Sequence, residues 1–112
     1  MKNTIMLKKN YEFKNVLSKG KYFSGECIEA FILKNNCANN FLGIAISSKS
    51  AKAVKRNRIK RYIRESYKKI EGKISFGNSI VFLWKKKKDA NNAKYFEIEK
   101  DIENIFDKAG IL

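Results

Sequence analysis

The feature that most constrains the fold is a short segment in which nearly every residue is apolar. Residues Asn78 to Trp84 read NSIVFLW, and the five from Ile80 to Trp84 are all hydrophobic. A strand with alternating polar and apolar residues can leave one face in water, whereas an unbroken apolar run needs cover on both faces. Gly72 and Gly77 interrupt the chain before this run. The sequence therefore predicts a central strand at 78–84.

The segment from Lys9 to Gly20 predicts a first helix. Asn10 is a residue type that caps helix N-termini, and Gly20 is a residue type that ends helices. The apolar residues between them recur at helical spacing and are Phe13, Val16 and Leu17.

Extended structure is predicted next. Residues from about Tyr22 to Lys34 and from Phe41 to Ser47 have strand-like composition, and the polar cluster NNCANN at 35–40 between them indicates a turn. This pattern predicts an antiparallel hairpin, with a further strand pairing from Tyr22 to Ser24.

The period becomes helical again from about Lys52 to Ile70. On a helical wheel the apolar positions, with Ser66, fall within one arc of about 140°; they are Ile59, Tyr62, Ile63, Ser66, Tyr67 and Ile70. The final helix has the stripe Tyr95, Ile98, Ile102, Ile105 and Phe106. Together these elements predict an α+β fold of one domain spanning residues 1–112. In it, helices pack on a mixed sheet of about four strands in the order α-β-β-β-α-β-α. We expect the strands before and after the long helix to be parallel.

The net charge limits the partners of this chain. Lys and Arg total 25 against 11 acidic residues, which gives +14 at pH 7. So many positive charges repel one another unless a polyanion screens them, and nucleic acid is the commonest such partner. No apolar run approaches the roughly 20 residues that cross a bilayer, and the N-terminus lacks the apolar core of a signal peptide. We therefore expect a cytoplasmic protein with no membrane partner.

The residue types needed for catalysis are scarce. The chain has no histidine, which excludes Ser-His-Asp and Cys-His nucleophile systems. Glu26 and Glu29 have an odd separation, which would place them on opposite faces of a strand. Cys27 and Cys37 are too few for a zinc site or a disulfide framework, so we expect reduced thiols. We expect neither a catalytic residue nor a metal site within this chain.

Arginine is confined to one segment of the predicted long helix. All four Arg lie between Arg56 and Arg64, and no acidic residue occurs from Ala30 through Arg64. The guanidinium group grips phosphate through a planar fork of donors, which the lysine ammonium lacks. The polar side of the wheel carries Asn57, Lys60, Arg61, Arg64 and Lys68. This surface predicts an RNA-binding helix, whereas the lysine run at 85–88 is equally consistent with a generic basic turn.

Residues 53–65 read AVKRNRIKRYIRE, which closely resembles the signature of the bacterial ribonuclease P protein family, with its Arg-Asn-Arg helix. The resemblance continues through LKKN at 7–10, Phe13, Gly20 and GIAIS at 43–47, so it covers nearly the whole chain. It implies a subunit of ribonuclease P, the endoribonuclease that matures the 5′ ends of transfer RNAs. Its partners would be ribonuclease P RNA and precursor tRNA, with no DNA partner. The RNA would be the catalyst, using Mg²⁺ held mainly by the RNA and the substrate. The isolated chain would be inactive.

The resemblance also implies roles for individual residues. The positions that match the family's RNA-facing helix are Arg56, Asn57, Arg58, Lys60, Arg61 and Arg64, to which we add Lys49, Lys52 and Lys68 as RNA-binding candidates. Phe13, Leu17 and Phe31 match the apolar wall of a cleft that receives the single-stranded 5′ leader, although core packing is an alternative for Phe13 and Leu17. The family fold further implies a left-handed crossover between the two parallel strands, against a rule that about 98% of such units obey.

Three residues before the long helix depart from the family pattern. Ser48 stands at one of the two adjacent Lys that the family usually has, and Ala51 and Lys52 stand at its Gly-Asn pair, which puts a local RNA or metal contact in question. Two other functions stay open on sequence alone. A ribosomal protein or RNA chaperone would have a similar composition, and a DNA-binding regulator would need base-reading residues and a second short helix that we do not find.

Overall fold

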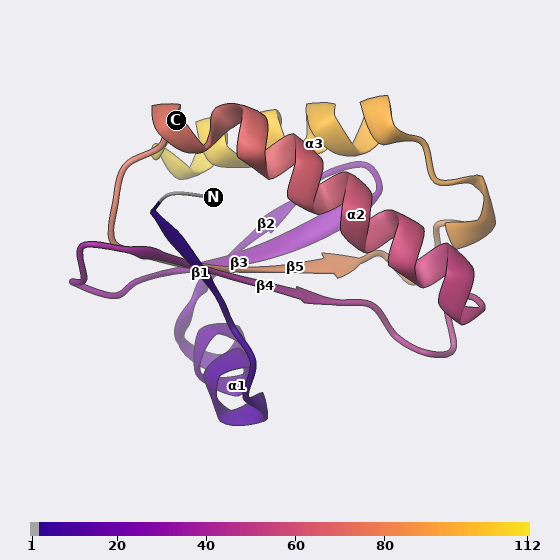
Figure 1. Cartoon of the computed structure of the whole chain (residues 1–112), viewed down its shortest axis with the longest axis horizontal. Helices are drawn as coiled ribbons and strands as arrows, with labels where there is room; N and C mark the ends of the chain where they lie inside the picture. The colour runs from indigo at the N-terminus through magenta and orange to yellow at the C-terminus, as the bar shows by residue number, and fades with distance from the viewer. Residues whose placement is uncertain (1–2) are drawn as a thin grey trace.

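A mixed five-stranded sheet forms the middle layer of the protein (Figure 1). The computed structural model describes residues 3–112. In chain order the elements are β1 (Thr4–Met6), α1 (Asn10–Lys19), β2 (Lys21–Ser24), β3 (Ile28–Lys34), β4 (Asn40–Ala45), α2 (Ala53–Ile70), the 3₁₀ turn η1 (Glu71–Lys73), β5 (Asn78–Trp84), the 3₁₀ turn η2 (Ala90–Asn92) and α3 (Tyr95–Ala109).

The strands lie in the order β1-β4-β5-β3-β2. β4 and β5 are parallel, as predicted for the strands that flank the long helix, and β5 pairs antiparallel with β3 along its whole length. The hairpin predicted for the segments on either side of the polar cluster at 35–40 was wrong, because β5 lies between β3 and β4 and pairs with both. The further strand predicted at Tyr22–Ser24 is present as β2 and pairs antiparallel with β3. β5 therefore lies at the centre of the sheet, where an apolar run is expected.

The expected count of four strands was wrong by one. The additional strand, β1, precedes the first helix and pairs parallel to β4, with Ile5 opposite Phe41. Three residues are too few to show the alternation that identifies a strand. β1 is held by contacts distant in sequence, among them a 2.6 Å hydrogen bond between the hydroxyl groups of Thr4 and Tyr67. The first helix also begins differently from the prediction, because Lys9 is its N-cap and Asn10 its first residue.

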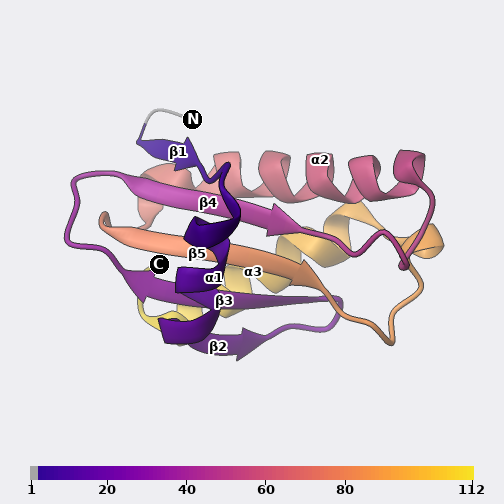
Figure 2. The same ribbon diagram turned by 90° about the horizontal axis from the view of Figure 1, so that it is seen from below.

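Helices cover both faces of the sheet (Figure 1). α2 and α3 lie on one face, and α1 lies on the other. Seen from the α1 side in Figure 2, β4 and β5 point the same way, α2 lies behind the sheet, and β5 lies on the far side of β4 from β1. The connection from β4 through α2 to β5 is thus left-handed, as the family resemblance implied.

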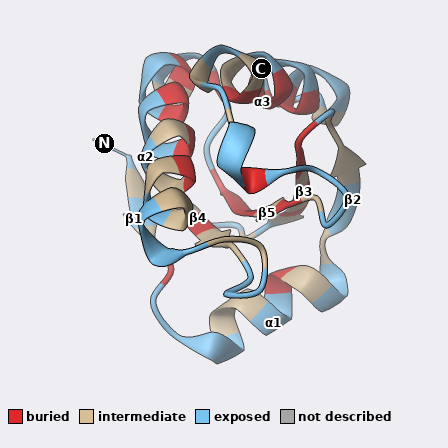
Figure 3. Ribbon diagram, turned by 90° about the vertical axis from the view of Figure 1, so that its right-hand side faces the viewer, coloured by how far each residue is buried: buried red, intermediate tan, exposed pale blue. Residues whose placement is uncertain are grey.

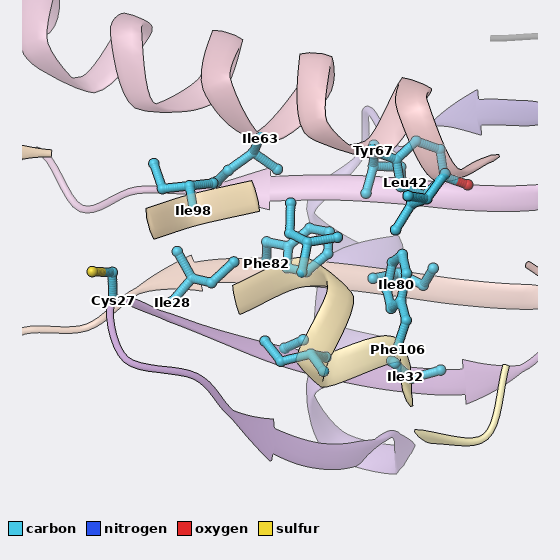
Figure 4. Close-up of a cluster of buried hydrophobic side chains, with 14 of the residues drawn as sticks. Cys27, Ile28, Ile32, Leu42, Ile63, Tyr67, Ile80, Phe82, Ile98 and Phe106 are labelled. Atoms are coloured by element: carbon cyan, nitrogen blue, oxygen red, sulfur yellow. The ribbon is translucent and has the colours of Figure 1, made fainter. Parts of the chain in front are cut away.

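The alternation of β5 divides its side chains between two apolar cores. Ile80, Phe82 and Trp84 belong to the larger core, under α2 and α3, whereas Val81 packs in the smaller core, beneath α1, with Leu83 against it. Figure 4 shows Ile80 and Phe82 among the side chains of the larger core. The prediction that this strand is covered on both faces is therefore confirmed.

Candidate nucleic-acid interface

The two sides of α2 separate apolar from basic residues. Ile59, Ile63 and Tyr67 are fully buried against the sheet and α3. The buried and exposed sides of the helix are visible in Figure 3. The exposed row follows a spacing of four, three and four residues and consists of Asn57, Arg61, Arg64 and Lys68. A helix with this spacing presents its side chains along one line, so these groups form a continuous polar row facing solvent.

The arginines of this helix are not neutralised by carboxylates. Between residues 3 and 112 the structure forms one ion pair, from Lys69 Nζ to Glu99 Oε2 at 3.0 Å. The guanidinium of Arg61 lies 5.6 Å from the ring centroid of Tyr62, which holds the side chain along the helix and leaves its charge unpaired. A polar row whose arginines have no carboxylate partner, on a chain with a net charge of +14, attracts a polyanion.

Arg56 also has a structural role, which the sequence did not indicate: it binds the loop before α2. Its Nη1 donates to the backbone oxygen of Ala51 at 2.6 Å and to that of Ser48 at 3.4 Å. The amide of Lys49 donates to Ser47 Oγ at 3.2 Å in the same loop. Arg56 therefore fixes the loop before α2 to the first turn of the helix. Lys49 belongs to the loop that this contact holds.

The N-terminus of α2 is unusually positive. Lys52 is the N-cap and makes no side-chain capping hydrogen bond, and the first turn contains no acidic residue. The positive end of a helix dipole is normally stabilised by an anion, and cations there are unfavourable. Lys52, Lys55 and Arg56 all lie at this end. A phosphate placed here would offset both the dipole and the like charges.

The remaining basic candidates are less exposed. Arg58 and Lys60 are half-buried on either side of the row, in contrast to Asn57 and Arg61. The structure thus brings all nine candidates onto α2 or the loop before it, but only part of the set faces solvent freely.

The three cleft candidates all border the smaller core. Phe13 and Leu17 of α1 and Phe31 of β3 are half-buried and pack against Val16 and Val81. Gly43 makes room for this arrangement, because a Cβ on it would lie 2.6 Å from Cε1 of Phe13. These aromatic and aliphatic side chains therefore combine core packing with a partly exposed apolar wall.

Tyr22 extends this wall, although the sequence pattern did not indicate it as a site residue. It pairs with Phe31 across β2 and β3, and the two ring centroids are 5.3 Å apart. The Tyr22 side chain is 47% exposed. Residues opposite each other in an antiparallel pair project from the same face. The predicted pairing of the segment around Tyr22 was thus a usable signal, but the exact register is set by the folded sheet.

The lysine turn after β5 lies between the wall and the loop that precedes α2. Lys85, Lys86 and Lys87 line a hollow of about 420 Å³ together with Tyr22 and Glu29. Lys86 also lines a second hollow, of about 440 Å³, with Lys49 and two serines of the loop before α2. Basic residues therefore extend from the loop before α2, across the lysine turn, to the exposed wall.

The described chain offers no metal centre or membrane helix. Within residues 3–112, no three His, Cys, Asp or Glu side chains come together in a way that could hold a metal ion. Over the same range, no helix is both long and apolar enough to cross a bilayer.

Comparison with known proteins decides the family. A family model described as Ribonuclease P matches residues 1–110. The chain belongs to the ribonuclease P protein family. The ribonuclease P protein component of Clostridium botulinum (strain Loch Maree / Type A3) is 38% identical over 106 residues, which cover 94% of each chain. That of Listeria monocytogenes serotype 4b is 34% identical over 100% of this chain and 93% of its own.

A solved structure agrees with this assignment. The RNase P protein from Thermotoga maritima has a TM-score of 0.82 and 25% identity, over 93% of this chain and 96% of that protein. The ribonuclease P protein family supplies the protein subunit of a tRNA-processing ribonucleoprotein enzyme, whose RNA is the implied partner. This assignment takes precedence over the ribosomal, chaperone and DNA-binding alternatives.

Proposed function

We propose that this chain binds ribonuclease P RNA and the 5′ leader of precursor tRNA, and so assists Mg²⁺-dependent removal of the leader in the cytoplasm. The observation that carries the proposal is the exposed polar row of α2, whose arginines are not paired with carboxylates, together with the lysine turn that lies between the loop before α2 and an exposed apolar wall. Folded RNA presents closely spaced phosphates, which suit the rigid row. A single-stranded leader presents unstacked bases, which suit aromatic side chains.

The basic row acts by neutralising phosphates. Each Lys or Arg that contacts a phosphate releases condensed counterions from the RNA, so binding is favourable and weakens as salt rises. Arg61 and Arg64 are exposed, and no carboxylate within residues 3–112 competes for them. They supply this attraction at no cost in broken intramolecular ion pairs.

The apolar wall acts on the leader by a different force. Base stacking on aromatic rings is tolerant of sequence and contributes about 1–3 kcal/mol per base. Phe31 and Tyr22 present ring surface at the edge of the smaller core, while Phe13 packs against Gly43. We assign stacking to the first two and a supporting role to Phe13 and Leu17.

The chemistry of cleavage is assigned to the RNA partner. The described residues of this chain do not form a cluster that suits Mg²⁺, so we propose that the RNA and the substrate hold the metal. The chain contributes affinity and position, and we expect the purified protein to leave precursor tRNA intact.

Reconstitution tests this proposal. The chain is combined with its cognate ribonuclease P RNA, and cleavage of precursor tRNA is measured at low Mg²⁺. We expect strong stimulation by the wild type, weaker stimulation by Arg64→Ala, and wild-type stimulation by Lys100→Ala, which removes an exposed charge from α3. Absence of stimulation by the wild type would refute the proposal. Equal loss in both variants would show that overall charge, and not the α2 row, is responsible.

A further inference from the structure

A carboxylate lies on the same face of the sheet as the apolar wall. Glu29 is two residues before Phe31 in β3, and residues two apart on a strand project from one face. Ile28, Ala30 and Ile32 point into the larger core, which leaves Glu29, Phe31 and Leu33 on the opposite face. Glu29 is half-buried there and pairs across the strands with Leu83.

Tyr22 holds this carboxylate in place. Its hydroxyl donates a hydrogen bond to Oε2 of Glu29, and this contact raises the pKa of Tyr22. Within residues 3–112 no hydrogen bond reaches Oε1, and no lysine forms an ion pair with Glu29. The fixed carboxylate thus keeps one oxygen free to accept a hydrogen bond from a ligand.

The surroundings of Glu29 suit a nucleotide. The hollow of about 420 Å³ contains the exposed ring of Tyr22, the carboxylate and three lysines, and no residue of α1 lines it. The ring offers a stacking surface, and the lysines offer charges for phosphate. A carboxylate on this face repels phosphate, so the part of a ligand that lies beside Glu29 must offer a hydrogen-bond donor.

The free oxygen of Glu29 selects among bases by hydrogen-bond type. A carboxylate at neutral pH only accepts hydrogen bonds. The 4-amino group of cytosine donates at the position where uracil has a carbonyl oxygen, which is an acceptor. A base with an exocyclic amino group can therefore donate a hydrogen bond to Glu29. The carbonyl oxygen of uracil at the same position is negative, like the carboxylate oxygen, and is repelled by it.

We propose that Tyr22, Glu29 and the lysines at 85–87 form a nucleobase pocket that favours bases carrying an exocyclic amino group over uracil. This inference rests on the proposed function, because the ligand is taken to be single-stranded RNA such as the leader. Tyr22 stacks on the base and orients the carboxylate, Glu29 reads the amino group, and the lysines bind the adjoining phosphates.

The test compares two ligands of the same ring size. Binding of the full chain to oligocytidylate and oligouridylate of equal length is measured by fluorescence anisotropy at fixed salt. We expect the wild type to prefer cytidine by about fivefold or more, the lower end of the discrimination expected for one well-placed pair. A ratio close to one for the wild type would overturn the proposal.

Variants separate recognition from simple electrostatics. Glu29→Gln keeps the shape but adds an amide donor that uracil can accept, so we expect the cytidine preference to vanish while both affinities rise. Glu103→Gln removes the same charge from an exposed position on α3, and should leave the ratio unchanged. If Glu29→Gln alters both affinities equally, Glu29 has only a structural or electrostatic role. A thermal melt of each variant checks that it is folded.

A spectrophotometric titration checks the contact itself. Because the Glu29 hydrogen bond raises the pKa of Tyr22, Glu29→Gln should lower that pKa toward its ordinary value. An unchanged titration would refute the geometry on which the pocket depends.

Reconstituted cleavage distinguishes failure of this inference from failure of the proposed function. Precursor tRNAs with cytidine-rich and uridine-rich leaders are compared at low Mg²⁺. Stimulation of both substrates to the same extent would refute the pocket and leave the proposed function intact. No stimulation of either substrate would refute the proposed function as well.

Discussion

Replacing Asp101 by alanine should lower the free energy of unfolding by about 3–5 kcal/mol, because one buried carboxylate holds the loop between β2 and β3. Asp101 lies on α3 and is 3% exposed. Its Oδ1 accepts from the amide of Glu26 at 2.9 Å, and its Oδ2 accepts from the amides of Cys27 at 2.7 Å and Ile28 at 3.2 Å. These three bonds join segments more than 70 residues apart, since the residue separations are 75, 74 and 73.

The magnitude follows from which donors water can reach after the substitution. A hydrogen bond to a charged group contributes about 1.5–3 kcal/mol. Glu26 is exposed, so its amide is rehydrated when the carboxylate is removed, whereas Cys27 and Ile28 are buried. Two stranded donors give about 3–6 kcal/mol, and local relaxation favours the lower part of that range. This loss is large compared with the free energy of unfolding of a typical protein, which is about 5–15 kcal/mol.

Urea denaturation followed by circular dichroism measures the effect. Asp101→Asn keeps one acceptor oxygen and should lose about 2–3 kcal/mol. Glu103→Ala is the matched control, since it removes an exposed carboxylate from the same helix and should change stability by about 0.5 kcal/mol or less. If Asp101→Ala costs no more than the control, the hydrogen bonds do not stabilise the fold and the reasoning is wrong.

A double-mutant cycle with Gly25 tests the same contact independently. A Cβ on Gly25 would lie 2.8 Å from Cγ of Asp101, which is too close. Gly25→Ala should therefore destabilise the wild type more than it destabilises the Asp101→Ala variant. Equal effects in both backgrounds would mean that the two sites do not interact.

Three further predictions concern α2 and the smaller core. Arg61→Ala and Arg64→Ala should each reduce the slope of log binding constant against log salt by about one, with the melting temperature nearly unchanged; loss of the fold instead would show that the faces of α2 were assigned wrongly. Ile63→Ala removes a fully buried side chain and should cost about 2–5 kcal/mol in urea denaturation, whereas a cost under 1 kcal/mol would contradict its place in the core. Gly43→Ala should displace Phe13 and cost about 1–3 kcal/mol, and it should weaken leader binding more than binding to ribonuclease P RNA. The affinities for a leader oligonucleotide and for ribonuclease P RNA are measured in separate titrations. An equal fall in both affinities would contradict this prediction.

Features that depend on local period and composition could be predicted from the sequence alone. The buried side of α2 follows from the 3.6-residue repeat of Ile59, Ile63 and Tyr67, and each of these side chains is fully buried. The apolar run at 78–84 identified β5 to the residue, because only a central strand needs cover on both faces. The confinement of arginine to one helix gave the candidate interface, since residue choice at exposed positions is set by the ligand and not by packing.

Features that depend on partners distant in the chain appear only in the folded protein. β1 exists because β4 lies beside it, and the three residues of β1 contain no repeat that could reveal it. The tie from Arg56 to the loop before α2, the grip of Asp101 on the β2–β3 loop, and the Tyr22–Glu29 contact are all fixed by specific geometry. A residue's period states which face it occupies, but not which group it meets there. The partner is set only when helices and strands are packed together, because a hydrogen bond forms only within a narrow range of donor–acceptor distance, about 2.7–3.2 Å for an N–H group and an oxygen.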